Sequence, residues 1–442
     1  MKNLMKMALL FASALVINFS FTACDDDDDD DGGSSSSSNL TEQEEFMQEI
    51  TEQYLDDVVY ETYEDLANST TTLYTKITSL KTKIQAGTTI TQSEIDDICD
   101  NYKEARNYWE ESEAFLYGAA TDYNIDPHID TWPLDIETIR DVMASETNIS
   151  KLDQDDNDAI EYANEALNVD GQLGFHGLEF IFFRDGESRD VSFFNNNEVE
   201  SYEDYFTGYS ITAEEEIIYA KAVAADLRDR TYQLEVAWAG DDAVSSHISR
   251  IEECQSEWGT ELYGTTTNMG VSYGTALYGV DTDYYYVTSW RRVMSVILID
   301  GCSNICAEVA DQKMGQAYRC STGTETEDDD PNYIESPYSY NSFNDFYDNI
   351  VSIQNVLYGD CDCSLGDYDD DSIMAYLAKY NSSEASELED KLEAALDALQ
   401  ACKDSGTPFV KNPGSSLVGA AIEAVNDLDE ELGIANTWIL YN

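Results

Sequence analysis

Two side chains with metal-binding chemistry lie three residues apart in an apolar segment, residues 173–183. His176 and Glu179 share one face if this segment is a helix, because residues three apart are neighbours on a helix surface. The surrounding Phe and Leu residues would exclude water, and an imidazole with a carboxylate can ligate a borderline or hard metal ion. Gly174 and Gly177 leave room for another stretch of backbone. The plainer alternative is a core histidine hydrogen-bonded to its own glutamate.

Other functional motifs lack the partners that their chemistry requires. Residues 270–274 match the nucleophile elbow of serine hydrolases, but the histidine must then follow the serine, and no histidine follows His247. Asp153, Asp155 and Asn157 begin like a calcium-binding EF-hand loop, but the glycine at position six and the glutamate at position twelve are missing, so we expect a helix start there. Neither common glycine-rich phosphate-binding motif is present, and nucleotide chemistry has no support.

Acidic residues dominate the composition. The 442 residues include 23 Lys+Arg and 90 Asp+Glu, which gives a formal net charge of −67. Nucleic acids and anionic lipid surfaces are therefore poor partners, because both would meet an acidic field, and we expect no nucleic-acid partner. The hydrophobic fraction of 42%, with 30 Tyr, 15 Phe and 6 Trp, is too high for a disordered acidic polymer. We therefore predict a folded protein with an acidic surface that attracts cations.

The N-terminal segment carries signals for export and anchoring. Lys2 and Lys6 precede an apolar stretch that is too short to remain as a membrane-spanning helix, and small residues lead up to Cys24. This pattern predicts a lipoprotein signal peptide over residues 1–23 and a lipid on Cys24. The alternative is a plain signal peptide with an unmodified Cys24, because Phe21 stands where a lipobox usually has Leu.

An acidic and serine-rich segment follows the expected lipidation site. Residues 24–39 contain consecutive aspartates, then two glycines and a run of serines. Like charges repel, and the Gly/Ser run has no side chains that pack, so we expect a flexible tether. The protein would then be an outer-membrane lipoprotein of the cell envelope that faces the periplasm or the cell surface.

The remaining cysteines predict cross-links. An even number of them in an exported chain favours up to four disulfides, whose pairing the sequence leaves open. The alternative is a zinc site built from the closely spaced pairs Cys302/Cys306 and Cys361/Cys363, although neither spacing is that of a common zinc motif. The full set is Cys99, Cys254, Cys302, Cys306, Cys320, Cys361, Cys363 and Cys402.

Helix signals recur from residue 40 onward, whereas strand signals are scarce. Thr41, Thr91 and Thr212 are each followed three residues later by Glu, the capping-box pattern of a helix start. Apolar residues then recur at helical spacing, and the chain has only 6 Pro. We predict an all-α fold with two tandem helical-bundle domains, residues 40–200 and 201–442.

A family resemblance extends beyond the first motif. The pattern Gly174-x-His176-x-x-Glu179, followed by aromatic residues, resembles the G-x-H-x-x-E signature of the imelysin family, also classified as peptidase family M75. The resemblance implies two helical domains with the motif near their interface, a connection with bacterial iron uptake and, in a few members, protease activity. It runs from about residue 41 to 442 and includes residues 106–118, 129–133, the region around Glu308, 335–346 and 354–359.

The resemblance implies a metal site, whose further ligands must come from distant segments. The candidates are Glu113, Asp130, His128 and Glu335, which offer mostly oxygen and therefore suit iron better than a catalytic zinc. Each has a plainer alternative. Asp130 and Glu335 would cap helices, His128 would be a surface histidine, and Glu113 would pair with Arg106.

The lining of the site is also implied by the resemblance. Ser336, Ser339 and Ser342 resemble the serine-rich signature of the family, and with Trp132 and Glu335 they are expected to face the same interface.

A zinc peptidase normally needs three protein ligands and an open position for water. An inverted H-x-x-E-H motif would supply a second histidine at position 180, where this chain has Phe.

Three functions are compatible with these observations. The first is an imelysin-like lipoprotein that holds iron or another metal, or an iron complex, with His176 and Glu179 in connection with iron uptake. The second is a metal-dependent peptidase in which Glu179 is a ligand or base, and the third is a structural lipoprotein without a metal. The missing second histidine favours the first. The expected cofactor is a metal ion, iron or alternatively zinc, and the expected partners are the membrane, through Cys24, and other proteins of iron uptake.

Overall fold

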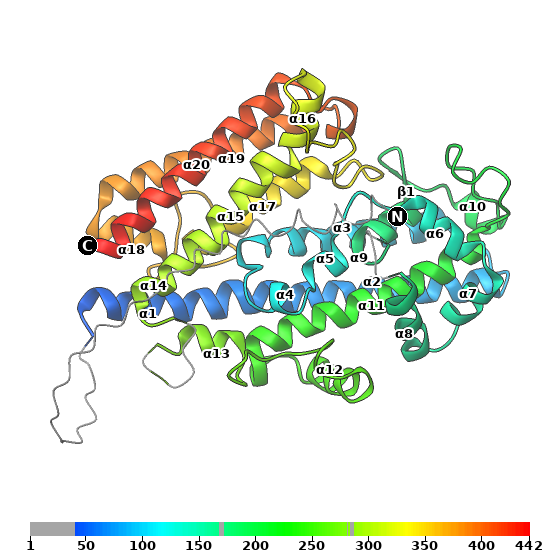
Figure 1. Cartoon of the computed structure of the whole chain (residues 1–442), viewed down its shortest axis with the longest axis horizontal. Helices are drawn as coiled ribbons and strands as arrows, with labels where there is room; N and C mark the ends of the chain where they lie inside the picture. Colours follow the sequence, from blue (N-terminus) through cyan, green and yellow to red (C-terminus); the bar gives the residue numbers. More distant parts are fainter. Residues whose placement is uncertain (1–39, 168–171, 281, 283–286) are drawn as a thin grey trace. The chain divides into compact units, whose positions relative to one another are not determined.

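The computed structural model describes residues 40–167, 172–280, 282 and 287–442 (Figure 1). Residues from Thr41 to Asn442 form one compact unit. The predicted signal peptide, the expected lipidation site at Cys24 and the tether lie outside the described residues, so they stay predictions.

The first half of the unit is built on two long helices. A continuous helix consists of α1 (Glu42–Tyr54), the π-helical η2 (Leu55–Tyr60) and α2 (Glu61–Gln85), and α3 (Gln92–Glu110) packs along α2. Shorter elements follow: η3 (Glu113–Phe115), α4 (Ala119–Asp122), α5 (Asp126–Ile129), α6 (Ile136–Met143), α7 (Glu146–Leu152), α8 (Asp156–Ala166), α9 (Gly174–Phe182), β1 (Phe183–Arg184), β2 (Glu187–Ser188) and α10 (Val191–Asn195).

The second half starts with a long buried helix, α11 (Ala213–Ala239), which packs on α2, α8 and α9. The C-terminal portion of this second half contains α17 (Ser342–Tyr358), α19 (Ser382–Asp404) and α20 (Ser416–Tyr441). Helix α19 packs on both α17 and α20. The remaining elements are η4 (Gly240–Asp242), α12 (Ser245–Trp258), α13 (Tyr273–Tyr278), α14 (Trp290–Ser295), η5 (Val296–Ser303), α15 (Asn304–Ala307), η6 (Glu308–Lys313), α16 (Gly315–Thr322), α18 (Ile373–Tyr380) and η7 (Phe409–Lys411).

The predicted all-α fold is confirmed, and so are the helix starts. Thr41, Thr91 and Thr212 each form a complete capping box, which satisfies backbone N–H groups that have no partner within the helix. Asp155, part of the incomplete EF-hand pattern, caps the start of α8 as expected. In the part of the chain that the structure describes, the two-stranded antiparallel hairpin β1–β2 is the only sheet.

Helix α3 lies at the centre of the arrangement. It contacts α2 and α9 on one side and α17 on the other, so helices from before and after residue 200 share a core (Figure 1). The long helix α11 also packs on α2 across that position. The domain boundary that we predict near residue 200 stays a prediction.

One apolar helical run passes through the core with two local distortions. It extends from Trp290 to Thr322 and contains the π-helical segments η5 and η6. By length and composition it could cross a membrane, but 61% of its apolar window is buried inside the protein, which is typical of a core helix. The π turn of η6 carries Glu308 and Lys313.

The predicted disulfides are wrong, because the eight cysteines of the described chain are all free. Five of them are buried in the core, and Cys320, Cys361 and Cys363 are partly exposed. Cys99 lies against the carbonyl oxygen of Phe182 and Cys254 against the carboxylate of Asp229. The zinc alternative gains no support either, since no group of converging metal-ligating side chains among the described residues includes a cysteine.

Candidate functional site

The first turn of α9 brings His176 against the segment that follows α5. Gly174 opens the helix with a φ of 69°, and a Cβ there would lie 1.9 Å from the carbonyl oxygen of Ile129. Gly177 is also tightly enclosed, since its Cβ would lie 2.5 Å from the hydroxyl of Tyr219. Gly174 therefore lets α9 approach the backbone just before Asp130 closely, and Gly177 lets it approach α11.

We expect Gly174→Ala to lower the free energy of unfolding by about 3 kcal/mol or more, because it combines left-handed backbone strain with a steric clash against backbone. Gly87→Ala is the matched control, because Gly87 has a similar φ of 62° but no atom within 4 Å of the added Cβ. The control should lose only about 1 kcal/mol. Urea unfolding of both variants measures the difference, and equal losses would show that the close approach at Gly174 is unimportant.

Asp130 is the centre of the first part of the site. Its Oδ1 lies 3.1 Å from His176 Nε2 and also contacts a guanidinium nitrogen of Arg106, while its Oδ2 accepts a 2.8 Å hydrogen bond from Trp109 Nε1. All four side chains are buried. The ring of Trp132 packs edge-on against the imidazole, with centroids 5.6 Å apart.

Glu179 connects α9 to a distant loop. Its Oε2 lies 3.4 Å from His176 Nδ1. Its Oε1 accepts three hydrogen bonds, from the backbone N–H of Tyr338 (2.9 Å) and from the backbone N–H and hydroxyl of Ser339 (both 2.7 Å). Glu179 therefore orients the histidine and fixes the loop before α17 at the same time.

The second part of the site is a group of buried carboxylates around Lys313. Its Nζ lies 3.4 Å from Glu110 Oε2, 3.4 Å from Glu113 Oε1 and 3.3 Å from Glu335 Oε1. Arg106 joins the two parts, because its guanidinium contacts Asp130, Glu110 and Glu335. We call the whole set the acidic cluster; it consists of Glu110, Glu113, Asp130, His176, Glu179, Lys313, Glu335, Asp345 and Arg106.

Charge in the acidic cluster is unevenly compensated. Burial lowers the pKa of His176, but contacts with Asp130 and Glu179 outweigh burial and raise this pKa to about 9. Burial raises the pKa of Asp130, but Arg106 and His176 outweigh it and lower this pKa below its usual range. Burial instead raises the pKa of Glu335 well above its usual value, and the nearby Lys313 only partly opposes this. The cluster therefore has more carboxylates than its own cations can neutralise.

Three sets of side chains in the acidic cluster have the geometry of metal ligands. In each set the candidate ligand atoms lie within 4.8 Å of one another: Asp130, His176 and Glu335; Glu110, Glu335 and Asp345; Glu110, Glu113 and Asp130. In addition, Glu335 Oε2 and Asp345 Oδ2 are buried without a hydrogen-bond partner. One imidazole nitrogen among several carboxylate oxygens fits a borderline or hard cation such as iron or manganese.

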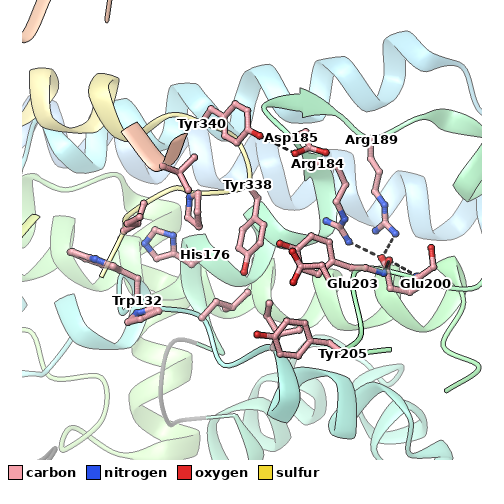
Figure 2. A pocket seen from close by; sticks show the side chains of 18 of the residues that line it. Trp132, His176, Arg184, Asp185, Arg189, Glu200, Glu203, Tyr205, Tyr338 and Tyr340 are labelled. Carbon is pink, nitrogen blue, oxygen red and sulfur yellow. Dashed lines mark hydrogen bonds and ion pairs between the residues drawn. The ribbon is translucent and has the colours of Figure 1, made fainter. Parts of the chain in front are cut away.

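A cavity of about 790 Å³ extends from His176 (Figure 2). Figure 2 shows His176 and Trp132 at one end, Glu200 and Glu203 at the other, and the ring of Tyr338 between them. Hydrated cations occupy much less volume than this, because each water takes up about 30 Å³. The cavity therefore offers a route to the imidazole that is wide enough for a metal complex as well as a free ion.

The far wall of the cavity is held by an ion-pair network. Glu200 contacts both Arg184 and Arg189, and Arg189 also contacts Glu216 of α11. Burial raises the pKa of Glu200, but the two guanidinium charges outweigh it and lower the pKa to about 2. Burial and the charge of Glu200 raise the pKa of Glu216 to about 7, although Arg189 opposes them.

These shifts predict how stability depends on pH. The pKa of Glu200 is lower in the folded chain than its ordinary value of 4.5, so its stabilising contribution is complete above about pH 4.5 and is lost as the pH falls towards 2. In wild type the free energy of unfolding should fall by about 2–3 kcal/mol over this pH range because of Glu200, and in Glu200→Gln this part of the fall should be absent. Protonation of Glu216 instead increases the free energy of unfolding as the pH falls from 7 to 4.5. The two effects therefore occur in different pH ranges.

Glu198→Gln is the control for this measurement, since Glu198 is exposed, lines the same cavity and forms no ion pair among the described residues. Chemical denaturation at a series of pH values should give the wild-type acid limb for Glu198→Gln. Identical acid limbs for Glu200→Gln and wild type would contradict the assignment.

The structure brings most of the sequence candidates together. His176, Glu179, Asp130, Glu113 and Glu335 all belong to the acidic cluster, within one helix-lined core. Glu335 does not act only as a helix cap, and neither does Asp130, because both carboxylates contact Arg106.

The serines expected to line the site lie beside the acidic cluster, whereas one of the candidate metal ligands, His128, does not. Ser339 bonds to Glu179, Ser342 Oγ donates a 2.6 Å hydrogen bond to the carbonyl oxygen of Glu335, and Ser336 is buried nearby in the chain with a φ of 48°. His128 turns away from the cluster, since its Nε2 lies 2.7 Å from Asp226 Oδ2 on α11.

The sequence analysis missed Glu110, Lys313 and Asp345 as members of the acidic cluster, and it missed the role of Arg106 as the central cation. For Arg106 and Glu110 the sequence did contain a signal. The buried stripe of α3 through Ile95, Ile98 and Tyr102 continues at helical spacing to Arg106 and Glu110, so charged residues occupy core positions. No comparable pattern marks Lys313, whose direction depends on the π turn of η6.

The fold and the acidic cluster define an all-α protein with a buried histidine–carboxylate centre. The sequence model of the Imelysin family, peptidase M75, matches residues 59–432. The chain therefore belongs to the imelysin family, as the resemblance predicts. No curated protein matches it significantly.

Two solved structures are similar to this chain. One is a protein from Parabacteroides distasonis, provisionally described as an iron-regulated protein A precursor, with 26% identity and a TM-score of 0.67 over 90% of this chain and 96% of that one. The other is an imelysin-like protein from Psychrobacter arcticum, with 11% identity and a TM-score of 0.52 over the same shares of the two chains. The second similarity concerns the fold alone.

Proposed function

We propose that this chain is a cell-envelope lipoprotein that binds a metal cation, iron first among the candidates, in connection with iron uptake. The cation binds at Asp130, His176 and Glu335, either as a free ion or as part of a complex held in the adjoining cavity. The lipid on Cys24 anchors the protein to the outer membrane. The iron-regulated description of the Parabacteroides relative supports iron as the first metal to test.

The convergence of Asp130, His176 and Glu335 carries this proposal. Their ligand atoms lie within 4.8 Å of one another, and Glu335 Oε2 is buried without a hydrogen-bond partner. A buried carboxylate oxygen without a partner is costly, and a cation would remove this cost. An acidic surface with a net charge of −67 raises the local concentration of cations around the cavity.

The geometry supports binding better than peptide hydrolysis. A general base needs an oxygen that is free to take a proton from water. Glu179 Oε1 instead accepts three hydrogen bonds from Tyr338 and Ser339, and its Oε2 faces the imidazole. The other two histidines are paired elsewhere, His128 with Asp226 and His247 with Glu235. Holding a ligand is therefore the function that these contacts favour.

Metal analysis tests the proposal. The purified protein, loaded with Fe²⁺ under anaerobic conditions and then dialysed, should retain one metal ion per chain by plasma emission spectroscopy. His176→Ala should lose that ion. His247→Ala is the matched control, because His247 is equally buried and paired with a carboxylate but lies outside the convergent sets. Retention of iron by His176→Ala at the wild-type level would overturn the proposed site.

A further inference from the structure

Lys313 occupies a position that resembles a cation site. Its ammonium is fully buried and is surrounded by Glu110 of α3, Glu113 of η3 and Glu335 of the loop before α17. The three Nζ–oxygen distances are 3.3–3.4 Å, longer than the roughly 2.7–2.9 Å of a charge-assisted hydrogen bond. Lys313 is therefore centred among three carboxylates rather than bonded closely to one of them.

The carboxylates beside Lys313 belong to two convergent sets that share Glu110. One set is Glu110, Glu113 and Asp130, the other is Glu110, Glu335 and Asp345, and the ligand atoms of each set lie within 4.8 Å of one another. Oxygen-bound divalent cations have bond lengths of about 2.0–2.6 Å, so opposite ligands lie roughly 4–5 Å apart. The oxygens within each set therefore have the separation that a divalent cation requires, and those around Nζ, at 3.3–3.4 Å, would move inward by roughly 1 Å to coordinate it. We call the space between these carboxylates the second compartment, and the Asp130, His176 and Glu335 set the first compartment.

Independent evidence for a second compartment comes from an unpartnered atom that is not part of the Asp130, His176 and Glu335 set. Asp345 Oδ2 is buried and accepts no hydrogen bond. Asp345 Oδ1 accepts a hydrogen bond from Asn341, and its nearest cation, Arg106, is 3.8 Å away. The second compartment therefore keeps a free acceptor oxygen even with Lys313 and Arg106 in place.

We propose that Lys313 is a tethered counter-cation that fills a second cation compartment next to His176 and so restricts the chain to one bound metal ion. The inference rests on the proposed function in one respect: the single metal ion of the wild-type chain is the one proposed to bind at Asp130, His176 and Glu335. The position of Lys313 on a π turn is consistent with this role, since such turns are frequent at functional sites.

Substitution of Lys313 tests this proposal with Mn²⁺ as the probe, because oxygen ligands suit this ion. Lys313→Met removes the charge and keeps an unbranched side chain of similar length. Titration calorimetry of wild type should give one Mn²⁺ per chain, and Lys313→Met should give two. Mn²⁺ should also raise the midpoint of thermal unfolding more in the variant than in wild type, because it replaces the lost charge.

Two further variants make the result specific. Lys379→Met is the control, since the Lys379 side chain is 48% exposed and lies outside both the acidic cluster and the cavity lining, and it should behave as wild type. Adding Glu113→Gln to Lys313→Met should return the stoichiometry to one, because it removes a ligand of the new compartment. Lys313→Arg keeps the charge and should bind one ion.

The possible outcomes separate the two proposals. A Lys313→Met protein that folds only with Mn²⁺, or that binds one ion more than wild type, supports the inference. If wild type binds no Mn²⁺ and Lys313→Met binds one, the proposed function fails and the inference on Lys313 holds. A variant with wild-type stoichiometry and no added stabilisation, or one that stays unfolded with Mn²⁺, overturns the inference and indicates that Lys313 is only an ion-pair partner.

Discussion

Replacing Arg106 with Met is expected to lower the free energy of unfolding by about 3–5 kcal/mol. The guanidinium is completely buried and contacts Asp130, Glu110 and Glu335. Removing one partner of a buried ion pair leaves the other charge uncompensated in a medium of low polarity. In this cluster one substitution would leave three carboxylates without their common cation.

Urea unfolding monitored by circular dichroism measures this loss, in buffer that contains a chelator so that no metal compensates. Arg319→Met is the matched control. Arg319 also pairs with two carboxylates, Asp311 and Asp329, but it lies nearer the surface. Exposed ion pairs contribute about 0–1 kcal/mol, so this variant should be close to wild type. A loss below 1 kcal/mol for Arg106→Met would show that the cluster does not depend on its central cation.

The positions of the motif residues could be predicted from sequence because their spacing is local. The three-residue separation of His176 and Glu179 places both on one side of any helix, and the apolar neighbours indicate burial. Gly174 carries a local signal too, although its reason is not local. Only the fold shows that the backbone of Ile129 passes 1.9 Å from the position of a Cβ at residue 174.

The partners of the motif could not be predicted in the same way, because their contacts join distant segments. Lys313 and Glu110 are 203 residues apart in the chain, and Arg106 and Glu335 are 229 apart. The resemblance to the imelysin family suggests Asp130, Glu113 and Glu335, and the sequence offers Arg106 only as a partner of Glu113, not as a cation shared by several carboxylates. Charge balance in a core depends on three-dimensional packing, for which helical periodicity is insufficient.

The cysteines show where a general rule gave the wrong result. An even count in an exported chain favours disulfides, yet disulfides are required mainly where a core is too small to stabilise the fold. Here long helices bury a large core, and Cys254 lies inside a cluster of helix contacts rather than beside another thiol. The size of the predicted helical core was therefore the better guide to the state of these residues.

Asp130→Asn is expected to weaken cation binding at the proposed site by about 100-fold or more. Removing a ligand-orienting group from a metal site commonly costs 10–100-fold in affinity, and Asp130 is both a candidate ligand and the partner of His176. The amide of Asn keeps the size of the side chain but removes the negative charge. One of its two polar atoms then also presents N–H groups towards Arg106 or Trp109, where an acceptor is needed.

Asp226→Asn separates this loss of binding from a general loss of stability. Asp226 is as deeply buried as Asp130, its Oδ2 lies 2.7 Å from His128 Nε2, and Arg230 lies 3.9 Å from its Oδ1. It thus repeats the carboxylate–histidine–arginine arrangement outside the acidic cluster. Both variants should lose stability in urea, but only Asp130→Asn should lose affinity for Mn²⁺ in calorimetry. Equal affinities in the two variants would mean that both aspartate–histidine pairs only stabilise the fold. The cation would then bind elsewhere.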